Sequence, residues 1–127
     1  MEREIEVFAA IQFLVMGLSH VVQRRAWVEF FVWLRDRGRA GVFAHGFLSL
    51  GFGALVVAFH DVWTGPAVVL TVVGWLYLAK SLQCFVVPQL GLRSLARVSP
   101  ERAWEFVVPG LAFLLLSALL GYVVLTR

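Results

Sequence analysis

Four stretches of the sequence are long and apolar enough to cross a lipid bilayer as α-helices, and they constrain the fold more than any other feature. A spanning helix needs about 20 mostly apolar residues, because the hydrocarbon core is about 30 Å thick. The stretches cover residues 5–23, 40–59, 66–87 and 106–125. None alternates like a barrel strand, and four strands cannot close a barrel. The sequence therefore predicts an all-α membrane protein, a four-transmembrane-helix bundle forming a single domain over residues 1–127.

The composition excludes several other classes of protein. Hydrophobic residues make up 61% of the chain and charged residues 15%, whereas soluble domains are about 45–50% apolar and about 25% charged. The net charge of +3 is not gathered into a basic run on a polar surface, so no nucleic-acid partner is expected. The single cysteine, Cys84, lies in an apolar stretch and is expected to be a small buried side chain.

The arginines predict how the chain is oriented in the membrane. Between the second and third stretches lies a short connection ending in Gly65-Pro66, which predicts a tight antiparallel hairpin. The two longer connections carry eight arginines: Arg24, Arg25, Arg35, Arg37, Arg39, Arg93, Arg97 and Arg102. Only Arg3 and Arg127 belong to the opposite side. The positive-inside rule therefore predicts cytoplasmic long connections, outer termini and an inner (plasma) membrane location.

The first long connection is predicted to be helical over about residues 25–37. Trp27, Phe30, Phe31 and Leu34 recur at spacings that place them on one face of a helix. An aromatic face opposite arginines is typical of an amphipathic helix lying at the membrane interface. The second long connection ends in Ser99-Pro100, which predicts a serine cap followed by proline at the first helical position. The last helix is therefore predicted to begin before its membrane span.

Small residues at four-residue spacing predict where helices approach one another closely. They are Ser49 with Gly53 in the second span, and Ser117 with Gly121 in the fourth. The fourth span otherwise has few polar side chains, so it is expected to face lipid or a partner subunit.

Several polar side chains lie at similar depths near the predicted cytoplasmic ends of the spans. Polar groups in hydrocarbon usually face the bundle interior or a wet cavity. We therefore predict one polar pocket for ligand binding or coupling, lined by His20, Gln23, His45, Lys80, Gln83 and Glu105. Three simpler interpretations stay open: Lys80 extends to the headgroups, Lys80 pairs with Glu105, and the histidines only make interhelical hydrogen bonds.

The polar residues at the opposite end are expected to have structural roles. Asp61 or Thr64 is expected to cap a helix, and Trp63 suits the interfacial aromatic belt. No carboxylate is expected inside a span apart from Glu105 at its mouth. With no metal-ligand spacing and no nucleophile motif, neither a catalytic residue nor a metal site is predicted.

These features leave three hypotheses for function. The first is a non-enzymatic oligomeric or accessory subunit, whose partners are the lipid bilayer and a second copy or another membrane subunit. The second is a small oligomeric transporter or channel with a proton- or anion-responsive His/Lys pocket. The third is haem binding, because His20 and His45 on neighbouring spans could ligate one iron axially.

Overall fold

All regular structure is helical within residues 2–126, the part of the chain that the computed structural model describes. Four helices are long and apolar enough to cross a membrane, which confirms the prediction of a small multi-pass membrane protein. The elements are α1 (Glu2–Val22), α2 (Arg24–Arg35), α3 (Arg39–Phe59), α4 (Val68–Val86), α5 (Pro88–Ala96), the 3₁₀ helix η1 (Pro100–Phe106) and α6 (Val107–Thr126).

The helix predicted between the first two spans is confirmed as α2. It ends at Arg35, two residues before the predicted end, and Gly38 follows with a φ of 58°. Glycine adopts this left-handed conformation at little cost, so the chain reverses there and enters α3.

The second long connection contains a helix that the sequence analysis did not predict. α4 ends at Val86, and Val87 has non-helical backbone angles, with φ −128° and ψ 69°, before Pro88. A residue preceding proline is disfavoured in the helical region, whereas proline itself suits the first turn of a helix. The chain therefore bends at Val87 and continues as α5.

The last helix begins before its span, as predicted, but its first turns differ from an α-helix. η1 begins at Pro100, and Arg102 inside it has non-helical backbone angles. Ser99 stands at the N-cap without a side-chain hydrogen bond to the backbone, so the predicted serine cap is wrong.

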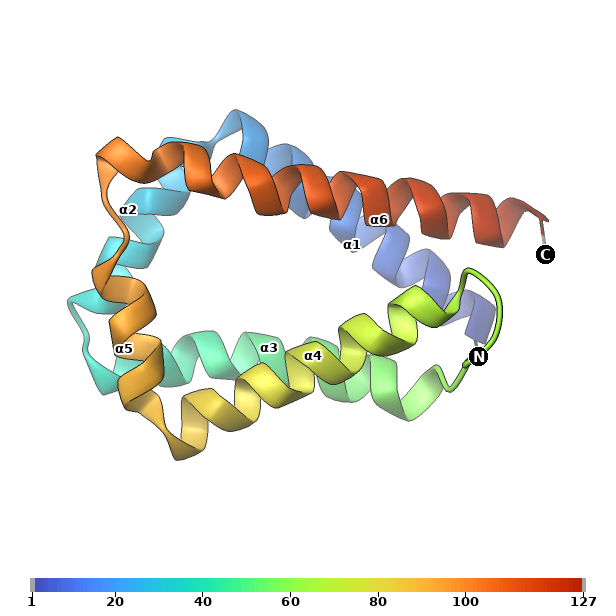
Figure 1. Cartoon of the computed structure of the whole chain (residues 1–127), viewed down its shortest axis with the longest axis horizontal. Helices are drawn as coiled ribbons and strands as arrows, with labels where there is room; N and C mark the ends of the chain where they lie inside the picture. The colour runs from blue at the N-terminus through green and yellow to red at the C-terminus, as the bar shows by residue number, and fades with distance from the viewer. Residues whose placement is uncertain (1, 127) are drawn as a thin grey trace.

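The four long helices form two antiparallel pairs, α1 with α6 and α3 with α4 (Figure 1). The pairs converge at the end that holds the termini and the α3–α4 loop, and they diverge toward the end where α2 and α5 lie (Figure 1). The tight hairpin between α3 and α4 is confirmed, with Gly65 at a φ of 72°. The result is a wedge-shaped arrangement of two helix pairs.

Small residues bring the helices of each pair together. A Cβ atom on Gly53 would lie 2.7 Å from the backbone nitrogen of Leu78, and one on Gly110 would lie 3.1 Å from the carbonyl oxygen of Gly17. The predicted contact at Gly53 is thus confirmed. The one at Gly121 is wrong, because no atom lies within 4 Å of its Cβ position. Ser117 instead donates a 2.8 Å hydrogen bond to the carbonyl oxygen of Ala10, and α6 packs on α1.

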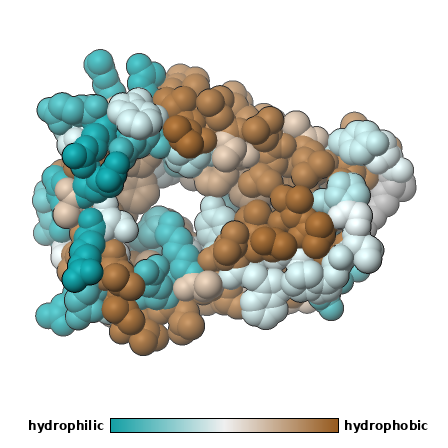
Figure 2. Space-filling view, in the orientation of Figure 1, coloured by the Kyte–Doolittle hydropathy of each residue, from teal (hydrophilic) through white to brown (hydrophobic). Residues whose placement is uncertain are grey.

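Two apolar clusters hold the wedge together. The larger one joins both helix pairs near the termini and consists of Ile5, Ala9, Phe13, Phe52, Val56, Leu70 and Leu120. The smaller one lies at the α2 and α5 end and consists of Leu34, Val42, Cys84 and Leu95. The outward faces of the long helices carry large exposed apolar side chains, as suits contact with lipid, whereas hydrophilic side chains gather over α2 and α5 (Figure 2).

Candidate functional site

A cavity of about 240 Å³ lies between the diverging ends of the helix pairs, beneath α2 and α5. The space-filling view shows the molecule hollowed at this end, with hydrophilic side chains around the opening (Figure 2). The polar side chains that line the cavity are those of His45, Lys80, Gln83 and Ser94, and the thiol of Cys84 also lines it. Its apolar wall comes from Phe31, Val42, Leu95, Val98 and Phe106. The structure thus brings together three of the six predicted pocket residues.

Lys80 is the cationic group of this cavity. Its side chain is exposed into the opening, and within residues 2–126 no carboxylate forms an ion pair with it. The predicted alternative of a Lys80–Glu105 pair is wrong, because Arg97 takes that carboxylate at 2.8 Å. The bond to Glu105 raises the pKa of the Arg97 guanidinium, so Arg97 stays charged.

His45 enters the cavity from α3 beside Gly46, at a point where α3 closely approaches α4. A Cβ atom on Gly46 would lie 2.9 Å from the Cβ atom of Cys84. The His45 ring packs edge-on against Phe31 of α2, with 5.5 Å between ring centroids. An edge contact of this kind fixes the imidazole plane. The cavity therefore presents an ammonium group and an oriented imidazole, from two different helices.

His20 and Gln23 lie elsewhere. His20 is buried, its Nδ1–H donates to the carbonyl oxygen of Met16 at 2.7 Å, and its ring stacks on Trp27 at 4.2 Å. Gln23 lines a separate groove of about 460 Å³ with Ser19, Ala26, Trp27 and Phe30. The Trp27 indole donates to the Ser19 hydroxyl at 2.8 Å, which draws α2 against the end of α1. The prediction of one shared pocket is therefore corrected for both residues.

Glu105 also lies outside the cavity. It lines a third, smaller hollow of about 170 Å³ together with Arg97 and Arg102. Three hollows thus take the place of the single predicted pocket, and the third adjoins the cavity through Ser94, Val98 and Phe106.

The two histidines proposed as haem ligands do not face one another across a shared space. Trp27 stacks on His20, Phe31 lies 6.1 Å from Trp27, and the Phe31 ring packs against His45. Only His45 lines the cavity. This layer of aromatic rings gives the haem hypothesis no support.

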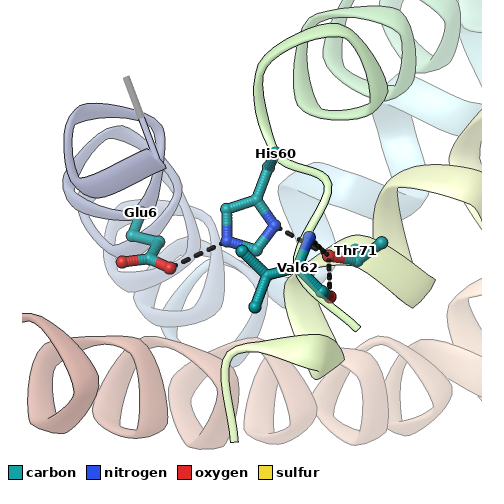
Figure 3. A network of polar contacts seen from close by, with 4 residues as sticks. All are labelled: Glu6, His60, Val62 and Thr71. Atoms are coloured by element: carbon teal, nitrogen blue, oxygen red, sulfur yellow. Dashed lines mark hydrogen bonds and ion pairs between the residues drawn. The ribbon is translucent and has the colours of Figure 1, made fainter. Parts of the chain in front are cut away.

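At the opposite end of the molecule lies a buried polar network that the sequence analysis missed (Figure 3). The carboxyl group of Glu6 on α1 contacts Nε2 of His60 at 2.8 Å, and both side chains are fully buried. On its other side, His60 Nδ1 lies 2.8 Å from the hydroxyl of Thr71 on α4. The statement that no carboxylate except Glu105 lies inside a span is therefore wrong, because Glu6 belongs to α1.

A signal for this network is present in the sequence. Glu6 lies near the outer end of the first apolar stretch, and His60 directly follows the second. The predicted topology places both at the same membrane level, where a buried acid and a histidine stabilise one another only when they meet. Asp61, by contrast, is exposed and accepts a hydrogen bond from the Trp63 indole.

The chain matches no known family of proteins, no curated protein and no solved structure.

Proposed function

We propose that the protein is a non-enzymatic membrane subunit that binds an anionic amphiphile in the cavity of His45, Lys80 and Gln83. The observation that carries the proposal is the Lys80 ammonium group, which is exposed into this cavity and has no carboxylate in an ion pair within the described chain. A cationic group in or near hydrocarbon is stabilised by an anionic partner. A phosphate or carboxylate ligand would supply that partner.

The shape of the cavity supports an amphiphile rather than a small ion. Its polar side chains lie on α3, α4 and α5, while Phe31, Leu95 and Phe106 form an apolar wall beside them. A headgroup at Lys80 could accept hydrogen bonds from the ammonium and the Gln83 amide. An acyl chain would then cover the apolar wall and lie between the diverging helix pairs.

A binding role also agrees better with the cavity lining than a catalytic one. No carboxylate lines the cavity, so it lacks the acid–base pair that general acid–base catalysis commonly uses. A general base also needs a nucleophile or substrate group within hydrogen-bond reach. We therefore keep the interpretation of a binding subunit, working as an oligomer or beside a partner subunit.

The orientation proposed for this subunit follows from its arginines. Eight of them belong to α2, α5, η1, the start of α3 and the connecting segments, all at the end of the molecule with the cavity. By the positive-inside rule, this end faces the cytoplasm and the termini face outward. The cavity would then take its ligand from the cytoplasmic leaflet of the inner membrane.

The proposal predicts that replacing Lys80 by glutamine weakens binding of an anionic lysolipid. A charge-assisted hydrogen bond contributes roughly 1.5–3 kcal/mol, which corresponds to about a tenfold to hundredfold change in affinity. Lysophosphatidic acid can be titrated into the purified protein in neutral detergent and followed by native mass spectrometry. Lys80→Arg should keep most of the affinity, because it keeps the positive charge.

A matched control is Arg93→Gln, which removes a cation from α5 that does not line the cavity. It should leave the affinity unchanged. Equal affinity of wild type and Lys80→Gln would contradict the proposal, and so would equal binding of zwitterionic lysophosphatidylcholine by the wild type.

A second candidate function is transport. It is favoured by the wedge shape, in which the helix pairs are packed together at one end and diverge at the other. The helix pairs are sealed together near the termini by the larger apolar cluster, while the cavity lies at the diverging end. A transporter that alternates its opening would need such an asymmetric resting state. Movement of lysophosphatidic acid across proteoliposome membranes would distinguish this function from binding alone.

A further inference from the structure

The Lys80 cavity and the hollow at Glu105 lie next to one another at the diverging end of the helix pairs. Their volumes are about 240 and 170 Å³, and Ser94, Val98 and Phe106 line both of them. None of these three residues is buried, so the border between the two spaces reaches the surface of the molecule. A ligand bound in the cavity can therefore extend along this border into the hollow.

The charged side chains of the two spaces leave positive charge without a counter-charge. The cavity holds Lys80, and the hollow holds Arg97, Arg102 and Glu105. Glu105 accepts two hydrogen bonds from the Arg97 guanidinium, at 2.8 and 3.3 Å, so these two residues neutralise one another. The charge of Arg102 also acts on Glu105, but within residues 2–126 neither Lys80 nor Arg102 forms an ion pair with a carboxylate. Each space therefore presents one cationic group to a ligand.

The Arg102 guanidinium keeps most of its hydrogen-bond donors available. Its Nη1 donates to the carbonyl oxygen of Arg97 at 3.2 Å, and the side chain is exposed. A guanidinium has five N–H donors in a planar arrangement. Such a group binds a phosphate through two parallel hydrogen bonds, whereas a lysine ammonium binds a phosphate as a point charge. Both cationic groups thus suit phosphate oxygens.

The border between the two spaces carries one polar side chain, that of Ser94 on α5. Val98 and Phe106, which also line both spaces, are apolar. Ser94 is exposed, and its hydroxyl makes no hydrogen bond within the described chain. This hydroxyl is therefore free to donate a hydrogen bond to a ligand oxygen. It stands where a ligand would pass from the Lys80 cavity to the Arg102 hollow.

We propose that the amphiphile of the Lys80 cavity carries a diphosphate headgroup, with one phosphate group at Lys80 and the terminal one at Arg102. A diphosphate has negative charge on each of two phosphate groups that share a bridging oxygen. This matches two cationic groups in adjoining spaces with a hydroxyl at the border. The inference rests on the proposed function and names the class of headgroup that the site selects.

The experiment compares two ligands that differ only in the terminal phosphate group, farnesyl diphosphate and farnesyl monophosphate. Each is titrated into the purified full-length protein in neutral detergent and followed by native mass spectrometry. The additional charge-assisted hydrogen bonds should make the diphosphate bind about tenfold to hundredfold more tightly. Inorganic diphosphate has no hydrocarbon chain to cover the apolar wall, so it should bind more weakly than farnesyl diphosphate.

The decisive variant is Arg102→Gln, which should bring the ratio of the two farnesyl affinities close to one. Arg102→Lys should keep most of the preference for the diphosphate, because it keeps the positive charge. Arg93→Gln is the matched control, since it removes a cation of α5 that lines neither space, and it should leave the ratio unchanged. Far-UV circular dichroism of each variant confirms that the helices persist.

Three results would overturn the inference: equal wild-type affinity for the two farnesyl ligands, an Arg102→Gln variant that keeps the full preference, or inorganic diphosphate that binds as tightly as farnesyl diphosphate. The proposed function has a separate readout in the same assay, because Lys80→Gln should weaken binding of both farnesyl ligands. A wild-type protein that binds neither farnesyl ligand would contradict the proposed function as well.

Discussion

Replacing Gly41 by alanine is expected to destabilise the protein by about 3 kcal/mol or more, because the added methyl group meets backbone rather than a movable side chain. Gly41 lies in the first turn of α3. A Cβ atom there would lie 1.8 Å from the carbonyl oxygen of Leu34 and 2.6 Å from its carbonyl carbon. Overpacking typically costs about 1–3 kcal/mol and more when nothing can yield. The overlap of the added methyl group with the Leu34 carbonyl group can be relieved only if α2 and α3 move apart.

Gly51→Ala is the matched control for this prediction. It makes the same substitution in the same helix, but no atom lies within 4 Å of the Cβ position of Gly51. Because alanine favours a helix over glycine by about 1 kcal/mol, this variant should be as stable as the wild type or slightly more so. Reversible unfolding in mixed micelles with increasing dodecyl sulfate measures both. Equal stability of the two variants would show that α2 and α3 do not meet at Gly41.

Replacing His60 by alanine is expected to destabilise the protein by roughly 1–3 kcal/mol, the range found when a buried polar group loses its hydrogen-bond partner. The Nε2 atom that contacts Glu6 and the Nδ1 atom that contacts Thr71 are lost together. The variant also leaves a space between α1, α3 and α4. The same unfolding assay measures the decrease in the free energy of unfolding.

Asp61→Ala is the control for His60→Ala, because Asp61 is the next residue and is exposed, and its carboxylate accepts a hydrogen bond from the nearby Trp63 indole. Surface substitutions usually change stability by less than about 0.5 kcal/mol. Glu6→Gln should also remain close to the wild type, since its amide keeps the contact with His60. A His60→Ala variant as stable as Asp61→Ala would mean that the network does not hold the helix pairs together.

The sequence predicts the spans well because length and hydropathy are local properties. Each of the four long helices lies within a few residues of its predicted stretch, since a bilayer of fixed thickness demands apolar runs of similar length. α2 was found from the spacing of its aromatic residues. α5 was missed because a nine-residue helix is too short to show a clear period, and its start depends on the bend at Val87 and Pro88.

The candidate site could be predicted only in part, because depth in the membrane does not fix the direction of a side chain. His45, Lys80 and Gln83 share the cavity. His20 lies at a similar predicted depth, but Trp27 covers its ring. Glu105 meets Arg97 eight residues away rather than Lys80 on another helix. The rotation of each helix and the course of the connections decide these contacts.

Glu6 and His60 are 54 positions apart in the sequence, so no local sequence pattern predicts their contact. Glu6 and His60 come together because the chain crosses the bilayer twice between them and the first and third helices converge at this end. Glu6 and His60 can be paired from the sequence only by comparing all polar residues at the same predicted membrane level.

Accessibility of a cysteine placed in the cavity tests the account most directly, because the account requires a polar cavity open to the cytoplasmic side. Gln83→Cys is made together with Cys84→Ala, since Gln83 is exposed and lines the cavity. Trp63→Cys, also with Cys84→Ala, reports the outer loop, where Trp63 is 58% exposed. A charged, membrane-impermeant thiol reagent should label the cavity position in inverted vesicles but not in intact cells, and lysophosphatidic acid should slow the labelling. The loop position should label in intact cells. Labelling of the cavity position from the outer face, or from neither face, would contradict the account.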